Sequence, residues 1–116
     1  MKLQIANLRG FQGRHELSIK PLTILIGENS AGKTTLLSAL YAVLQRDFPS
    51  PDGLNRPPFE LGSYETIATY RGGKYGRAGS FSLGFDPESK GARKIYATYA
   101  NRSGVPRIME LEVSSS

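Results

Sequence analysis

Apolar side chains recur at two spacings along the chain, and these spacings separate strands from a helix. Residues 3–6 and 15–20 alternate between apolar and polar side chains on either side of Gly10-Phe11-Gln12-Gly13. Alternation with period two around glycine predicts an antiparallel hairpin. Residues 22–26 are continuously apolar apart from Thr23, which predicts a buried strand of the parallel type. The following segment has apolar residues at three- and four-residue spacing, which predicts an amphipathic helix running to about Arg46: Leu36, Leu37, Leu40, Val43 and Leu44.

The middle of the chain is rich in proline and glycine. Pro49, Pro51, Pro57 and Pro58 exclude regular structure from about residue 47 to 59. Ser63 is a candidate N-cap for a short helix that runs through Ala68 or Thr69. A basic, glycine-rich loop follows over residues 71–79.

Three alternating runs close the chain, at residues 80–86, 94–100 and 108–113. They predict an antiparallel meander. Each run places three apolar residues on one face: Phe81, Leu83 and Phe85; Ile95, Ala97 and Tyr99; Met109, Leu111 and Val113.

The junction between the buried strand and the helix carries the strongest chemical signal. Gly27-Glu28-Asn29-Ser30-Ala31-Gly32-Lys33-Thr34 fits the pattern G-x-x-x-x-G-K-[ST] of a phosphate-binding loop. The two glycines allow backbone N–H groups to converge on phosphate oxygens at a helix N-terminus. The alternative is a plain tight turn before a helix capped by Ser30. Such a turn would need neither Lys33 nor the hydroxyl of Thr34.

The residue types assign roles around a nucleotide. Lys33 would reach the β- and γ-phosphates, and the hydroxyl of Thr34 would be a ligand of Mg²⁺. Thr35 would lie near the α-phosphate. The predicted cofactors are therefore ATP and Mg²⁺.

These elements predict a mixed α/β (α+β) fold: an antiparallel hairpin, a P-loop strand and helix, and a C-terminal β-meander. With 116 residues, the chain is short for a complete P-loop ATPase. We therefore expect a single, incomplete unit; the resemblance given below implies that it is the N-terminal lobe of an ATPase head. It divides into residues 1–46 (hairpin, P-loop strand and helix), 47–79 (irregular, with the short helix) and 80–113 (meander).

Charge and composition leave two interpretations open. The net charge is +5, and residues 71–107 hold eight basic residues against two acidic ones. Such a segment is either the footprint of a nucleic-acid partner or a solvated face. The absence of cysteine excludes disulfides and thiolate metal sites. No apolar run approaches the roughly 18 residues of a membrane span, and the chain opens directly into a strand pattern, so we expect a soluble, cytoplasmic protein without a membrane partner.

A hydrolytic ATPase also needs a carboxylate at the end of an apolar strand. No run of four apolar residues followed by Asp is present; Asp86 comes nearest, but Pro87 follows it and suits a turn. Glu110 and Glu112 alternate with apolar residues, which indicates a solvated face. We therefore assign no catalytic residue in this chain.

Residues 1–46 resemble the N-terminus of ABC-type P-loop ATPases of the SMC/RecF-like group. The resemblance includes bacterial "AAA family" ATPases found with nucleases of the overcoming-lysogenization-defect type. It rests on residues 3–11, which include Asn7-Leu8-Arg9, and on residues 22–40. Residues 59–67 also resemble the segment after the first helix in the latter proteins.

The resemblance implies roles that spacing alone does not give. It brings Arg9 to the nucleotide, whereas its position alone favours an ordinary turn arginine. It matches Asn29 to the family's asparagine near the γ-phosphate, but the metal-coupling glutamine has no convincing counterpart. It also implies a second ATPase head as a dimer partner, with DNA and a nuclease as further candidate partners, in DNA processing, repair or phage defence.

The family's remaining motifs lie downstream, so hydrolysis would belong to the full-length ATPase, while this chain binds ATP. Two alternatives remain. One is an ABC transporter nucleotide-binding subunit. The other is a non-catalytic basic nucleic-acid-binding module with a vestigial P-loop.

Overall fold

The computed structural model describes residues 1–9, 11–18, 30–55, 61–68 and 79–115. Their elements are, in chain order, strands β1 (Lys2–Leu8) and β2 (Phe11–Ser18), helix α2 (Ser30–Val43), the 3-10 helix η1 (Pro51–Asn55), helix α3 (Tyr64–Ile67), and strands β3 (Ser80–Asp86), β4 (Arg93–Arg102) and β5 (Val105–Ser115).

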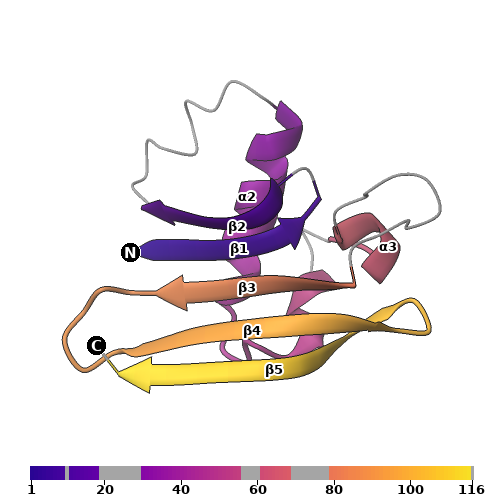
Figure 1. Cartoon of the computed structure of the whole chain (residues 1–116). Coiled ribbons are helices and arrows are strands. Elements are labelled where there is room, and N and C mark those ends of the chain that lie inside the picture. The colour runs from indigo at the N-terminus through magenta and orange to yellow at the C-terminus, as the bar shows by residue number, and fades with distance from the viewer. Residues whose placement is uncertain (10, 19–29, 56–60, 69–78, 116) are drawn as a thin grey trace.

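The five strands form one antiparallel sheet in the order β2-β1-β3-β4-β5 (Figure 1). β1 and β2 form the predicted hairpin, with Ile5 opposite His15. β3, β4 and β5 form the predicted meander. Both predictions are confirmed. The hairpin and the meander are joined because β1 also pairs with β3, where Ile5 lies opposite Leu83.

The predicted α/β fold class is wrong. The described fold is mostly a five-stranded antiparallel sheet with one long helix, instead of an alternation of P-loop strand and helix. The physical reason is the β1–β3 pairing, which merges two sequence-distant hairpin systems into one sheet. The run at residues 22–26, from which the parallel strand was predicted, lies outside the described residues.

One face of the sheet packs against α2, and the core lies between them. Among the α2 side chains that the structure describes, the buried apolar ones are Ala39, Ala42 and Val43. Across the sheet, the rings of Phe81 and Tyr99 stack with centroids 5.1 Å apart. The members of the core with an exposed fraction of 2% or less are the following: Leu3, Ile5, Leu8, Ala39, Ala42, Leu54, Leu61, Tyr64, Ile67, Ala68, Phe81, Leu83, Ala97 and Tyr99.

The end of α2 and the proline-rich stretch differ from the predictions, and α3 ends at Ile67 rather than at Ala68 or Thr69. α2 ends at Val43 rather than near Arg46, and Leu44 is 56% exposed. The proline-rich stretch contains the 3-10 helix η1, although regular structure was excluded there. Proline is compatible with the first position of such a turn, because the N–H it lacks has no partner there. Gly53 and Leu54 of η1 are buried.

The last strand also departs from prediction. Met109, Leu111 and Val113 were assigned to the apolar face of the meander, but their exposed fractions are 56%, 49% and 51%. The pattern holds for Leu111 and Val113, which lie opposite Ala97 and Ile95. It fails at Met109, because a bulge there places Ile108 opposite Tyr99 on the core side instead. Exposure follows because the core cluster does not extend over this part of β5.

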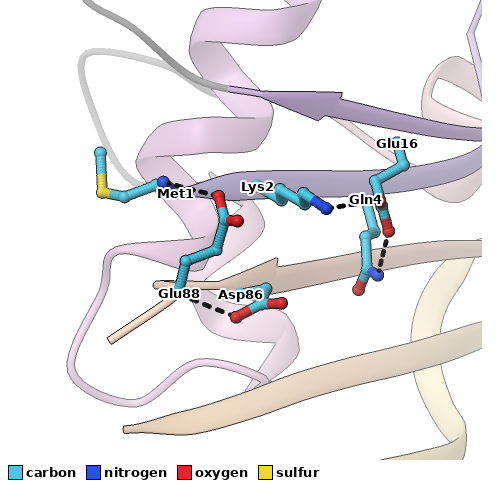
Figure 2. A network of polar contacts seen from close by, with 6 residues as sticks. All are labelled: Met1, Lys2, Gln4, Glu16, Asp86 and Glu88. Carbon is cyan, nitrogen blue, oxygen red and sulfur yellow. Dashed lines mark hydrogen bonds and ion pairs between the residues drawn. The ribbon is translucent and has the colours of Figure 1, made fainter. Parts of the chain in front are cut away.

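The opposite face of the sheet is polar. Figure 2 shows Gln4 donating from Nε2 to Oε2 of Glu16 at 2.9 Å, while Lys2 Nζ lies 3.3 Å from Oε1 of the same carboxylate. The Gln4 hydrogen bond, with Lys2 next, lowers the pKa of Glu16. The N-terminal amine pairs with Glu88 at 3.1 Å, and the backbone N–H of Glu88 donates to Asp86.

Tyr96 crosses this face beside Gly84. An added Cβ at Gly84 would lie 2.6 Å from Cδ2 of Tyr96 and 2.7 Å from Oε1 of Gln4. The Arg14 guanidinium lies 4.8 Å from the centroid of the Tyr96 ring on β4. Gln4 is therefore only 1% exposed, and its Oε1 has no hydrogen-bond partner within the described structure.

Candidate functional site

Helix α2 begins at Ser30, inside the sequence that was predicted to bind phosphate. Residues 30–34 therefore form the first turn of a 14-residue helix. The first N–H groups of a helix have no intrahelical acceptor, and the helix dipole favours an anion beside them. A helix N-terminus of this kind can therefore accept an anion.

Only part of the predicted loop can be placed. Gly27, Glu28 and Asn29 lie outside the described residues. The same holds for the side chains of Ser30, Ala31, Gly32, Lys33 and Thr34, so their roles stay predictions. Thr35, directly after the motif, has a described side chain, and it is 4% exposed.

Arg9 lies beside this helix turn. Its Nη1 donates to Oγ1 of Thr35 at 3.4 Å, which is a long contact, and its Nη2 donates to the backbone oxygen of Leu61 at 2.9 Å. The structure thus brings together Arg9 and Thr35, two of the predicted site residues. Its position in the sequence had favoured an ordinary solvated arginine in a turn. The structure instead joins Arg9 to α2 and to residue 61 through these two contacts.

Local backbone geometry directs Arg9 toward α2. Asn7 and Arg9 both have positive φ, at 53° and 46°. The Asn7 side chain accepts a hydrogen bond from the N–H of Gly13 at 3.0 Å, and the β1–β2 register shifts between Ala6 and Leu8. Asparagine tolerates this conformation, whereas arginine adopts it at a cost. Such strain at a non-glycine residue persists only where surrounding contacts hold it.

The contacts that hold Arg9 come from residues 61–68. The N–H of Arg9 donates to the carbonyl of Ile67 at 2.6 Å, and Leu8 forms an isolated antiparallel bridge with Ala68. Spacing gave no signal for these partners, because Leu61 is 52 residues from Arg9. The only sequence signal was the resemblance over residues 59–67.

Residue 61 is itself held by η1. Asn55 exchanges two hydrogen bonds with Gly62: its Nδ2 donates to the Gly62 carbonyl at 2.9 Å, and its Oδ1 accepts from the Gly62 N–H at 2.7 Å. The N–H of Leu61 donates to the carbonyl of Leu54 at 2.8 Å. The Leu61 carbonyl is thereby a fixed acceptor for Arg9.

The chemistry available at the described site is anion binding. Thr35 contributes a hydroxyl, Arg9 a guanidinium and α2 its N-terminal backbone. Within residues 1–9, 11–18, 30–55, 61–68 and 79–115, no group of three or more His, Cys, Asp or Glu side chains could hold a metal ion. No helix in this part of the chain combines the length and apolar character that a membrane crossing needs.

The chain was compared with protein families, curated proteins and solved structures. No curated protein and no solved structure matches it. A family model described as "AAA ATPase domain" matches residues 1–99, which include Arg9, the whole phosphate-loop motif, residues 61–68 and β3. Because this match covers most of the chain, the protein belongs to the AAA ATPase domain family.

Proposed function

We propose that this chain binds Mg-ATP through residues 27–35 and Arg9, as the N-terminal lobe of an ATPase head of the SMC/RecF-like group. The observation that carries the proposal is the contact between the Arg9 guanidinium and Thr35, one residue after the G-x-x-x-x-G-K-T pattern. Family membership supports nucleotide use, because the matched model is that of an ATPase domain.

Each residue has a separate role in the proposed site. Residues 27–32 present backbone N–H groups to the phosphates, and Lys33 supplies a positive charge to the β- and γ-phosphates. Thr34 is the metal ligand through its hydroxyl. Asn29 lies toward the γ-phosphate, and Thr35 toward the α-phosphate.

Bound ATP would supply the phosphoryl group, and Mg²⁺, which Thr34 would help to hold, would supply positive charge to the phosphates. In the proposal, this chain binds and orients the nucleotide. Hydrolysis uses carboxylates from the full-length ATPase, closed as a dimer of two heads in DNA processing, repair or phage defence. A nuclease is the further partner that the resemblance adds.

Titration of the chain with Mg-ATP in an isothermal calorimeter measures the binding affinity and tests the proposal. Lys33→Ala removes a charged donor, so we expect at least about tenfold weaker binding. Arg9→Ala should also weaken binding. Arg14→Ala is the matched control, because it removes an equal charge from the exposed side chain stacked on Tyr96. Unchanged affinity in Lys33→Ala refutes nucleotide binding through this loop.

A nucleic-acid-binding module is the second candidate. It is favoured by a hollow of about 490 Å³ at the β4–β5 hairpin, where Arg102 and Arg107 lie beside Asn101 and Met109. Both arginines are exposed. Binding of single- or double-stranded DNA that weakens steeply with salt and is lost in an Arg102→Ala/Arg107→Ala variant would support it. Absence of DNA binding at low salt excludes it.

A further inference from the structure

Strand β5 is one edge of the sheet, and β2 is the other (Figure 1). An edge strand presents unpaired backbone N–H and C=O groups, so natural proteins protect it with charges, bulges and short length. β2 has this protection: Gln12, Arg14 and Glu16 are exposed, and its pairing with β1 contains a register shift.

β5 is longer, and the charged residues among its last six positions, Glu110 and Glu112, are both acidic. It has 11 residues, and its register with β4 is regular from Glu110 to Ser115. The single register shift lies before this stretch, between Thr98 and Tyr99 of β4. Within the part of the chain that the structure describes, the last six residues of β5 therefore form a regular open edge.

One face of this open edge is apolar. Leu111 and Val113 lie opposite Ala97 and Ile95 on β4, on the side of the sheet that carries the core. Ala97 is fully buried, whereas Leu111 and Val113 are about half-exposed. The apolar layer thus continues beyond the part that α2 and η1 cover.

The other face of the same edge is acidic. Glu110 and Glu112 lie opposite Thr98 and Tyr96, and both carboxylates are exposed. In the part of the chain that the structure describes, neither takes part in an ion pair. The edge therefore offers apolar contacts on one side and unneutralised negative charge on the other.

We propose that residues 110–115 of β5 accept an extended segment of a partner protein in which apolar and basic residues alternate. The segment would add a strand to the sheet, with its backbone paired to β5. Its apolar side chains would cover Leu111 and Val113, and its lysines or arginines would lie beside Glu110 and Glu112. Oppositely charged cross-strand neighbours stabilise such a pair, and like charges destabilise it.

This charge pattern disfavours a second copy of the chain as the occupant. In a two-fold antiparallel pairing centred on Leu111, Glu110 of one copy faces Glu112 of the other. Centring the pairing on either glutamate places that residue opposite itself. A centre between two residues places Leu111 or Val113 opposite a polar residue. Every two-fold arrangement centred between Glu110 and Glu112 is therefore penalised, whereas a pairing centred on Val113 places Glu112 opposite Ser114.

The test uses two capped peptides of about nine residues, one alternating lysine with valine and the other alternating glutamate with valine. Binding to the whole chain is followed by fluorescence anisotropy of a labelled peptide. We expect the lysine peptide to bind more tightly. This preference would oppose the net charge of +5, so general electrostatic attraction cannot produce it.

Glu112→Lys should weaken binding of the lysine peptide by at least about fivefold and strengthen binding of the glutamate peptide. Glu88→Lys is the matched control, because it makes the same charge change at an exposed residue between β3 and β4. Leu111→Ser should weaken both peptides. Because Leu111 is 49% exposed, this variant is expected to fold.

The proposal is overturned if the lysine peptide does not bind at millimolar concentration. It is also overturned if Glu112→Lys and Glu88→Lys change the affinity for the lysine peptide equally. It is also overturned if sedimentation shows a dimer that Leu111→Ser dissociates, because a second copy would then occupy the edge. None of these outcomes depends on nucleotide binding.

Discussion

Gly84 lies under the ring of Tyr96, and replacing it by alanine tests the packing of the polar face. The new Cβ would lie 2.6 Å from Tyr96 Cδ2, 2.7 Å from Gln4 Oε1 and 3.1 Å from the carbonyl oxygen of Ile95. Cδ2 is close to the base of the tyrosine side chain, so the ring must turn away as a whole. Gln4 is 1% exposed and has little room to move.

The magnitude follows from two opposing effects. Overpacking costs about 1–3 kcal/mol, and the displaced ring also loses the Arg14 contact, worth about 0.5–1 kcal/mol at an exposed site. Alanine recovers about 0.5–1 kcal/mol, because it loses less conformational entropy in a strand than glycine. These terms leave a net cost of about 0.5–3.5 kcal/mol, so we expect Gly84→Ala to destabilise the chain by about 2 kcal/mol, the middle of this range, and to lower the Tm by about 8 °C.

Urea unfolding followed by far-UV circular dichroism gives the free energy of unfolding. The same substitution in a Tyr96→Thr background is the control, because threonine keeps a strand-forming residue without the ring. Gly84→Ala should then cost less than in the wild-type background, because the contact with Tyr96 is gone while the contact with Gln4 Oε1 remains. An equal loss of stability in both backgrounds, or a gain in the wild-type background, would refute the assignment of the clash to Tyr96.

Two further substitutions test the core and the site. Tyr99→Phe removes the hydrogen bond from the Tyr99 hydroxyl to the Pro49 carbonyl (2.6 Å) and should cost about 1 kcal/mol in urea unfolding. Burial raises the pKa of Tyr99, so its proton is held more tightly in the folded state; stability should fall as pH rises above about 10, and less steeply in the Phe variant. A loss of stability that is equal in the two proteins would contradict this. Arg9→Gly should be more stable than Arg9→Ala by about 1 kcal/mol, because glycine adopts the φ of 46° without strain. Both variants should weaken Mg-ATP binding equally. Equal stability of the two variants would show that residue 9 is not strained.

Local pattern predicted the strands of this fold but not how they are assembled. Alternation identified β1, β2 and the meander, because each side of a strand repeats every second residue. It could not identify the pairing of Leu3 with Phe85, since strands distant in sequence carry no signal of their partners. Alternation also could not predict that Leu111 is exposed, because the pattern gives the face of the sheet on which a residue lies but not what covers that face.

The start of helix α3 was predicted correctly, but for a reason that the structure does not support. Ser63 occupies the N-cap position of α3, as predicted, but its side chain makes no capping hydrogen bond. The N–H of Tyr64 instead donates to the carbonyl of Gly104, in the β4–β5 turn, at 3.0 Å. This tertiary partner is invisible in the sequence around residue 63. The candidate site was likewise predictable only in part. The phosphate-loop motif is local in sequence and could be identified, whereas the contacts of Arg9 with Thr35 and Leu61 are distant in sequence and could not.

Residues 61–68 connect the candidate nucleotide site with the far end of the meander. At one end the Leu61 carbonyl accepts from Arg9, and at α3 the Tyr64 N–H donates to Gly104. Arg9 therefore divides its guanidinium between a short bond to a fixed carbonyl and a long contact to the Thr35 hydroxyl. A phosphate oxygen is a stronger acceptor for guanidinium than a hydroxyl. In the proposed complex, Arg9 would exchange only its weaker contact, and its bond to Leu61 would keep the nucleotide joined to α3 and to the β4–β5 turn.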